Sequence, residues 1–366
     1  MSMTIRQRMM AVLRNMQPDQ VPVAIYSRYH RSGEIERAAR NNGLGIMYFE
    51  PPVSLLAPPW HLHPGYLSEV KGASFHVDFT WEEGGQVETR TYRTPVGSVS
   101  QRIVKDPSYG SDWISQHYIK APQDYEVMHY IVESTVFQKR NAAIRQQISD
   151  LGEDGIVLGR VDRLPFQKLL IELAGPERLF IDLAEDPGPV EALLEAMKLR
   201  QQEQFTLALE SDAEVIWQPD NVTADMTNPR YFGKYLTPLY QRFGNACRQA
   251  GKVYAVHMDG RLAALKALVA AAPIDVIESF SLGEMGGNVT TAEALASWPG
   301  KVLCPNFPAS LAEDTQDDIT RYLKGVIADF KGHPFMLQVS EDIPLNSYDR
   351  VLPAACRAAA ESKGLE

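Results

Sequence analysis

The chain carries the stretch Val253-Tyr254-Ala255-Val256-His257-Met258-Asp259-Gly260, in which a short apolar run ends in polar residues. Apolar runs of this length are typical of buried strands in a parallel sheet. From residue 150 onward the pattern recurs, and stretches with helical spacing separate the runs. Strands that alternate with helices predict parallel strands joined by right-handed crossovers. The other runs lie at 156–159, 215–217, 274–277, 301–304 and 335–338, and two earlier ones at 21–26 and 46–49.

Eight such runs in one chain predict the α/β class and a (β/α)8 TIM barrel. The alternative is an open, doubly wound sheet, which usually carries a glycine-rich turn after an early strand. The sequence contains neither a GxGxxG nor a Walker A motif, so the barrel is favoured. Pro238 lies inside a helical stretch near 228–250 and predicts a kink or break there.

Residues 70–104 follow a different pattern. Polar and apolar residues alternate over 74–81, 86–92 and 98–104, with turn sequences between them. This period of two predicts an antiparallel β-meander. We expect it to be an insertion in one barrel domain that spans residues 1–366.

The composition excludes several classes of protein. The 366 residues include 36 Lys and Arg against 46 Asp and Glu, a net charge of −10, which argues against a nucleic-acid partner. No apolar run approaches the 18 residues of a membrane span. The three cysteines are far apart, as in proteins of a reducing compartment. We therefore expect a cytoplasmic protein with no membrane partner.

The ends of the predicted strands collect polar residues. Catalytic residues of βα barrels come from the C-terminal ends of the strands, although loops are polar and helices need caps in any protein. Loop polarity and helix capping do not account for His257, because it directly follows a buried run and precedes a carboxylate by two residues. The polar residues at these ends include Gln218, Asp220, Asn221, His257, Asp259, Glu278, Asn306, Gln338 and Glu341.

His257 and Asp259, with a carboxylate from another strand, form a reasonable ligand set for a divalent metal. Imidazole and carboxylate ligands suit Zn, Fe, Mn or Co. Glu341 is the first choice for the third ligand, and Glu278 and Asp220 are the alternatives. A histidine between two carboxylates is equally suited to proton transfer without a metal.

Several of these segments resemble the uroporphyrinogen decarboxylase superfamily. The resemblance is close over 150–366 and loose before that, and it implies a (β/α)8 barrel with a helix break at Pro238. The segments that carry it are Asp220-Asn221, Asn228-Pro229-Arg230-Tyr231-Phe232, Leu236-Thr237-Pro238, Val256-His257-Met258-Asp259-Gly260, Val276-Ile277-Glu278-Ser279 and 301–308.

The chain is most like the corrinoid-dependent methyltransferase branch of that superfamily. The decarboxylases hold substrate propionates with an N-terminal arginine motif, which the segment 28–34 does not keep. The methyltransferases bind zinc through His-x-Cys and a later Cys. Here His257 matches the His, while Asp259 and Glu341 stand at or near the Cys positions. This resembles members that demethylate methoxy compounds or methylamines.

The resemblance therefore implies a methyltransferase that moves a methyl group from a small methoxylated or methylated substrate to a corrinoid protein. A homodimer is compatible with it. Its alternatives are a metal-free decarboxylase of uroporphyrinogen or a related acid, in which Asp220 would stabilise a cationic intermediate, and a non-catalytic ligand-binding barrel. The expected residues are His257, Asp259 and Glu341 for a divalent metal such as Zn, Asp220, His257 and Glu278 for catalysis, and Arg28, Trp217, Asn221 and Gln338 for substrate binding.

Overall fold

The computed structural model describes residues 2–57, 62–82, 85–105 and 112–361. Contacts between residues divide the chain into two compact units. The expectation of a single domain over 1–366 stays a prediction. The first unit comprises Met1–Glu50, Ala142–Arg160 and Asp212–Glu366, and the second comprises Pro51–Asn141 and Val161–Ser211.

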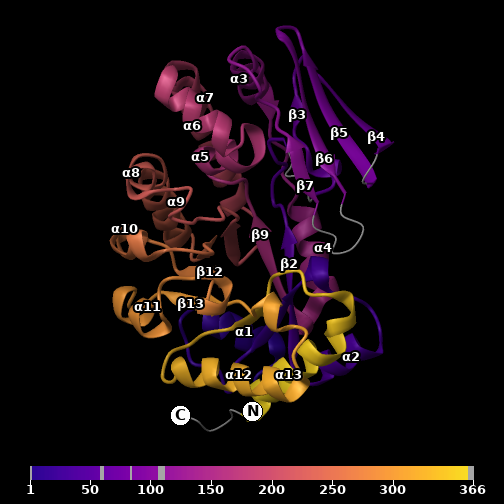
Figure 1. Ribbon diagram of the computed structural model, residues 1–366, viewed down its shortest axis with the longest axis vertical. Helices are drawn as coiled ribbons and strands as arrows, with labels where there is room; N and C mark the ends of the chain where they lie inside the picture. The colour runs from indigo at the N-terminus through magenta and orange to yellow at the C-terminus, as the bar shows by residue number, and fades with distance from the viewer. Residues whose placement is uncertain (1, 58–61, 83–84, 106–111, 362–366) are drawn as a thin grey trace. The chain divides into compact units, whose positions relative to one another are not determined.

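The first unit is built on eight parallel strands, in the spatial order β13-β12-β11-β10-β9-β2-β1-β14 (Figure 1). Bridges from Leu303 to Phe335 and from Asn306 to Gln338 bring β13 beside β14, so the barrel is nearly closed. The predicted α/β TIM barrel is therefore confirmed. The strands are β1 (Val23–Tyr26), β2 (Leu44–Glu50), β9 (Gly155–Arg160), β10 (Val215–Gln218), β11 (Val253–His257), β12 (Val276–Phe280), β13 (Val302–Pro305) and β14 (Leu337–Val339).

Burial explains why these strands read as apolar runs. Every residue of β1, β9, β10, β12, β13 and β14 is buried, as expected for strands covered on both faces. At the start of β9 the backbones approach closely, since a Cβ on Gly155 would lie 2.0 Å from the carbonyl oxygen of Ile46. Only glycine fits there.

The helices of this unit follow local sequence signals. At the start of α1 (Ile5–Leu13), Thr4 and Gln7 form a capping box. The stretch with Pro238 is divided into α8 (Pro229–Tyr231), a π-helical turn (Phe232–Leu236) and α9 (Thr237–Gln249), because proline lacks the N–H of a continuous helix. In the described part of the chain, no helix is both long and apolar enough to span a membrane. The other helices are α2 (Glu34–Asn41), α4 (Asn141–Leu151), α10 (Lys266–Ala271), α11 (Thr291–Ser297), α12 (Gln316–Asp329) and α13 (Tyr348–Glu361).

Strands β12 and β14 each begin two residues later than the apolar runs at 274–277 and 335–338 predict. The apolar run at 274–277 predicts a strand there, but β12 begins at Val276. Asp275 lies just before the strand and accepts a hydrogen bond from the backbone N–H of Tyr254 at 2.8 Å. Glu278 is consequently inside the strand rather than in the loop after it.

The second unit contains an antiparallel sheet in the order β4-β5-β6-β7 (Figure 1). Strands β4 (Ser74–Glu82), β5 (Gly85–Thr94) and β6 (Gly97–Val104) confirm the meander predicted near 70–104, and β7 (Trp113–Gln116) extends it. Helix α3 (Asp124–Ser134) packs against β5 and β6. The unit also contains β3 (Glu69–Val70), β8 (Thr135–Val136), α5 (Pro165–Lys168), a π-helical turn (Leu169–Leu173), α6 (Pro176–Glu185) and α7 (Pro187–Leu209).

Candidate active site at the barrel mouth

Four strands contribute side chains to a cluster around Glu278. His257 is the neighbour of Glu278 in the β11–β12 pairing, and its ring Nδ1 lies 2.7 Å from Glu278 Oε2. Trp217, from β10, donates its Nε1–H to the same oxygen at 3.0 Å. Tyr26, from β1, donates its hydroxyl to Glu278 Oε1. Tyr26, Trp217, His257 and Glu278 are called the mouth cluster below.

The exposed fraction of the side chains rises from Glu278 through His257 to Asp259. The side chain of Glu278 is 1% exposed, that of His257 14% and that of Asp259 26%. Three donors surround the buried carboxylate of Glu278, which satisfies both of its oxygens. The other ring nitrogen of His257, Nε2, lies 3.8 Å from Asp259 Oδ2. His257 therefore presents Nε2 toward the more exposed side of the cluster.

His257 is positively charged at neutral pH. Burial acts to lower the pKa of its ring, but the carboxylates of Glu278 and Asp259 outweigh burial and raise that pKa to about 9. An imidazolium donates from both nitrogens, so Nδ1–H donates to Glu278. Its Nε2–H is the donor left for a ligand on the side of Asp259.

This charge predicts a specific pH dependence of stability in the metal-free protein. The pKa of about 9 in the folded state lies above the 6.5 of an ordinary histidine. The stabilisation is therefore complete below pH 6.5 and lost as the pH rises through 9. At most about 3 kcal/mol should be lost. Urea unfolding at pH 6.5 and 9.5 measures it, and an equal loss in His257→Gln would contradict the assignment.

Two strained residues follow predicted catalytic carboxylates. Ser279 and Asn221 have φ of 60° and 55°, a region that non-glycine residues rarely adopt. Ser279 lies in an irregularity of the β12–β13 pairing, and its N–H donates to Gln338 Oε1 at 3.1 Å. The Nε2 of Gln338 is 2.9 Å from the sulfur of Met47. Gln338 is thus engaged within the barrel and holds the backbone next to Glu278.

Glu341 interacts electrostatically with Arg28, His257 and Asp259. Burial raises the pKa of Glu341, and the carboxylate of Asp259 raises it further, while His257 and Arg28 oppose the rise. Arg28 is exposed, and its guanidinium lies 4.4 Å from the centre of the Tyr29 ring. The predicted metal residues and Arg28 therefore act on one another.

The side chains of His257, Asp259 and Glu341 are of the types that bind a divalent metal. Their arrangement in the structure does not form a metal site. Within the described ranges, no three His, Cys, Asp or Glu side chains are grouped closely enough to hold one ion. His257 Nε2 and Asp259 Oδ2 face each other at 3.8 Å. The hydrogen bond from Nδ1 to Glu278 is the contact that orients metal-binding histidines in other proteins. An ion would have to replace the proton on Nε2.

Asp220 lies in a hydrogen-bond network with the helix that follows β10. Its side chain is fully buried, and its Oδ2 accepts a hydrogen bond from the Tyr240 hydroxyl at 2.6 Å. Burial and this carboxylate raise the pKa of Tyr240 well above its usual range. Asn221, the next residue, is exposed.

Sequence reasoning missed Tyr26. The polar residues that follow each apolar run are the candidates that the sequence offers, whereas Tyr26 is the last residue of β1. A rule that includes polar-tipped aromatic residues at the end of a run finds it, since a buried tyrosine hydroxyl needs a partner. Trp217, which was predicted, is the last residue but one of β10.

Comparisons with known proteins show the fold. A methyltransferase from Methanosarcina mazei is similar with a TM-score of 0.56 and 13% identity, over 98% of this chain and 99% of that chain. A chitinase from Chromobacterium violaceum ATCC 12472 covers 93% of this chain and 99% of its own at 10% identity, but its TM-score of 0.39 is too low to indicate a common fold. No family model matches the chain, and no curated protein matches it.

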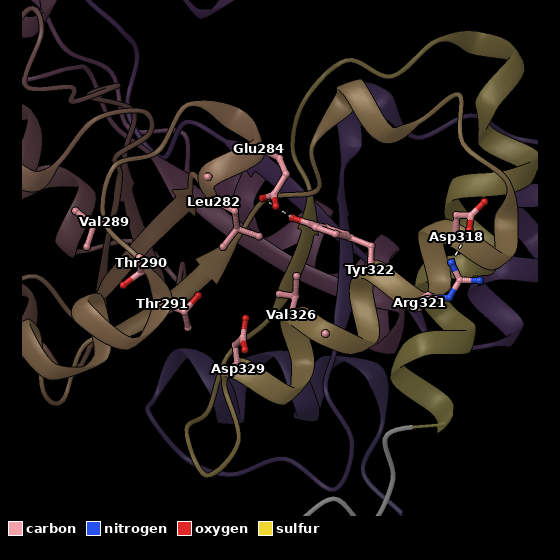
Figure 2. Close-up of a pocket in the computed structure, with 12 residues that line it drawn as sticks. Leu282, Glu284, Val289, Thr290, Thr291, Asp318, Arg321, Tyr322, Val326 and Asp329 are labelled. Carbon is pink, nitrogen blue, oxygen red and sulfur yellow. Dashed lines mark hydrogen bonds and ion pairs between the residues drawn. The ribbon is translucent and has the colours of Figure 1, made fainter.

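A cleft of about 560 Å³ lies between the loop after β12 and helix α12 (Figure 2). The hydroxyl of Tyr322 donates to Glu284 across it at 3.0 Å. Asp318 and Arg321 form an exposed ion pair at 2.6 Å. None of the predicted catalytic, substrate-binding or metal residues lines this cleft. It is therefore separate from the mouth cluster.

Proposed function

We propose that the protein is a cytoplasmic methyltransferase. It moves a methyl group from a small methoxylated or methylated substrate to a corrinoid protein, assisted by a divalent metal such as zinc. The observation that carries the proposal is His257, which is charged and is held by the buried Glu278. The methyltransferase fold of the Methanosarcina protein and the sequence resemblance support it.

The reaction needs positive charge beside the atom that the methyl group leaves. When the methyl carbon moves to a cobalt nucleophile, its bond to the substrate oxygen or nitrogen breaks, and both electrons stay on that atom. A fixed cationic donor beside that atom lowers the barrier. His257 Nε2–H is suited to this role, because Glu278 fixes the ring and keeps it charged. A phenoxide is basic enough to take the Nε2 proton of His257, because the pKa of the corresponding phenol is near 10.

A divalent ion on His257 Nε2, Asp259 and Glu341 would supply the same positive charge as a Lewis acid, in place of the Nε2 proton. Glu278 has the same task with or without the ion, since it orients the ring through Nδ1. Trp217 packs its ring 5.9 Å from that of His257 and is proposed to form a wall of the substrate site. Arg28 and Asn221 are proposed substrate contacts. Asp220 and Gln338 are proposed to position other groups of the site. Asp220 accepts a hydrogen bond from Tyr240, and Gln338 accepts one from the backbone N–H of Ser279.

Metal analysis tests the role of the ion. Protein purified with Zn, Fe, Mn and Co available is expected to hold about one ion per chain, and His257→Ala to hold less than about a tenth of that. His129→Ala is the matched control, because His129 also pairs with a glutamate, at 3.4 Å from Glu133, but on α3. If metal-free protein transfers the methyl group at the full rate, the reaction does not need the ion, and the Nε2 proton of His257 would supply the positive charge.

Two assays separate the proposal from the carboxy-lyase alternative. The first supplies reduced cobalamin, in place of the corrinoid protein, with a panel of aryl methyl ethers and methylamines. The second supplies uroporphyrinogen. We expect methyl transfer in the first assay and no loss of carboxylates in the second, and the opposite pair of results would reject the proposal.

A further inference from the structure

Strand β4 leaves one long edge of the antiparallel sheet open. Among the described strands it pairs with β5 alone, and Figure 1 shows it as the outermost strand of this sheet. Its pairing with β5 is continuous from Ser74–Arg93 to Glu82–Gly85, without a bulge. The other edge therefore presents unpaired backbone N–H and C=O groups along nine residues.

This edge has no lysine, proline or bulge, which are features that usually prevent strand association, and its charged residues are Asp78 and Glu82. Soluble proteins protect edge strands with lysine, proline, bulges or a covering element, and β4 has no lysine or proline. It carries two exposed aromatic residues, Phe79 at 57% and Trp81 at 81% exposure. A long, regular edge with exposed aromatic residues is typical of a binding surface.

The sequence of β4 is complementary to itself in an antiparallel pairing. If two copies pair with Val77 opposite Val77, Phe75 of each copy lies opposite Phe79 of the other. On the opposite face, His76 lies opposite Asp78, and Ser74 lies opposite Thr80. Aromatic pairs and opposite charges directly across a strand pair each contribute about 0.2–1 kcal/mol.

Other registers pair these residues differently. Centring the pair on Asp78 would set Phe75 opposite Trp81 and Val77 opposite Phe79, but it would also put two carboxylates opposite each other, which is destabilising. Sliding one strand along the other by a single residue would set the apolar side of one strand against the polar side of the other. Centring on Phe79 would replace the two Phe75–Phe79 pairs with a single Phe79–Phe79 pair, and it would set Val77 opposite Trp81 and His76 opposite Glu82.

We propose that two copies of this chain associate through their β4 edges, in an antiparallel pairing centred on Val77. The partner is thus a second copy, and the dimer has the two-fold symmetry that such a pairing requires. This inference does not depend on the proposed function.

Sedimentation measures the association. At about 50 µM, above the micromolar Kd expected of a small interface, the wild-type protein should sediment near 82 kDa, twice its 40.9 kDa. Phe79→Lys should raise the Kd at least about 10-fold. The control is Trp113→Lys, since Trp113 is also half-exposed but lies on β7, the other edge. A wild-type monomer, or a dimer weakened only by Trp113→Lys, would overturn the proposal.

Cysteine cross-linking tests the register. The native cysteines are buried, so oxidation should cross-link only an introduced cysteine. Val77→Cys should form a disulfide-linked dimer, because a residue opposite itself has its Cβ atoms about 5 Å apart. Phe79→Cys, on the same side of the strand, should cross-link at least about 10-fold more slowly. Faster cross-linking of Phe79→Cys would overturn the pairing centred on Val77.

Discussion

Replacing Glu278 with glutamine is expected to lower the pKa of His257 from its raised value of about 9. The burial that lowers this pKa would remain, while only Asp259 of the two carboxylates that oppose it would be left. Methyl transfer at pH 7 should slow by about 100-fold or more, since the ring of His257 would carry less positive charge and would lose the carboxylate that orients it. Histidine NMR titration and single-turnover rates measure the two effects.

The same substitution should destabilise the fold. Tyr26, Trp217 and His257 all donate to Glu278, and a glutamine offers one oxygen in place of two. The free energy of unfolding should fall by on the order of 3 kcal/mol. Glu284→Gln is the matched control, because Glu284 follows the same strand but is exposed, and it should change stability by less than about 1 kcal/mol. Equal losses in the two variants would contradict the role of Glu278.

Replacing Lys168 with methionine is expected to destabilise the protein by about 3–5 kcal/mol, because it removes a buried cation that pairs with two buried carboxylates. The Nζ of Lys168 lies 2.8 Å from Asp162 Oδ1 and 2.7 Å from Glu172 Oε2. The Nε of Arg163 is 2.8 Å from the other oxygen of Glu172. All four side chains are buried. Burial acts to lower the pKa of Lys168, but the two carboxylates outweigh it and raise that pKa.

Lys198→Met provides the comparison for Lys168→Met. Lys198 also pairs with a glutamate on its own helix, at 3.1 Å from Glu195, but both side chains are exposed. Such surface pairs contribute about 1 kcal/mol or less. Urea unfolding of the two variants measures the difference, and a loss from Lys168→Met as small as that from Lys198→Met would show that the buried network is not important for stability.

The barrel could be predicted from the sequence because its strands are buried on both faces. That burial produces the apolar runs, and the polar residues that end them mark where each strand stops. The limit of this signal is visible at β12, where the run at 274–277 misplaces the strand by two residues. Side chains before the strand, such as Ile274, are as apolar as those within it, so hydrophobicity alone does not set the boundary.

The candidate site was predictable only in part. His257 and Glu278 were found because they are charged residues at a strand end, and the structure brings them to 2.7 Å. Tyr26 was missed because it reads as part of an apolar run. Asp162 also follows a strand, but it binds Lys168 in a buried network instead. Which strand ends face one another depends on the strand order, and that order is a property of the folded chain.

The rate of methyl transfer with His257 replaced tests the central claim most directly. The measurement is the transfer of a labelled methyl group from the best substrate of the panel to reduced cobalamin, at pH 7. The wild-type protein and His129→Gln should transfer at the same rate, and His257→Gln at least about 100-fold more slowly. A His257→Gln variant that transfers the methyl group at the wild-type rate would contradict the account.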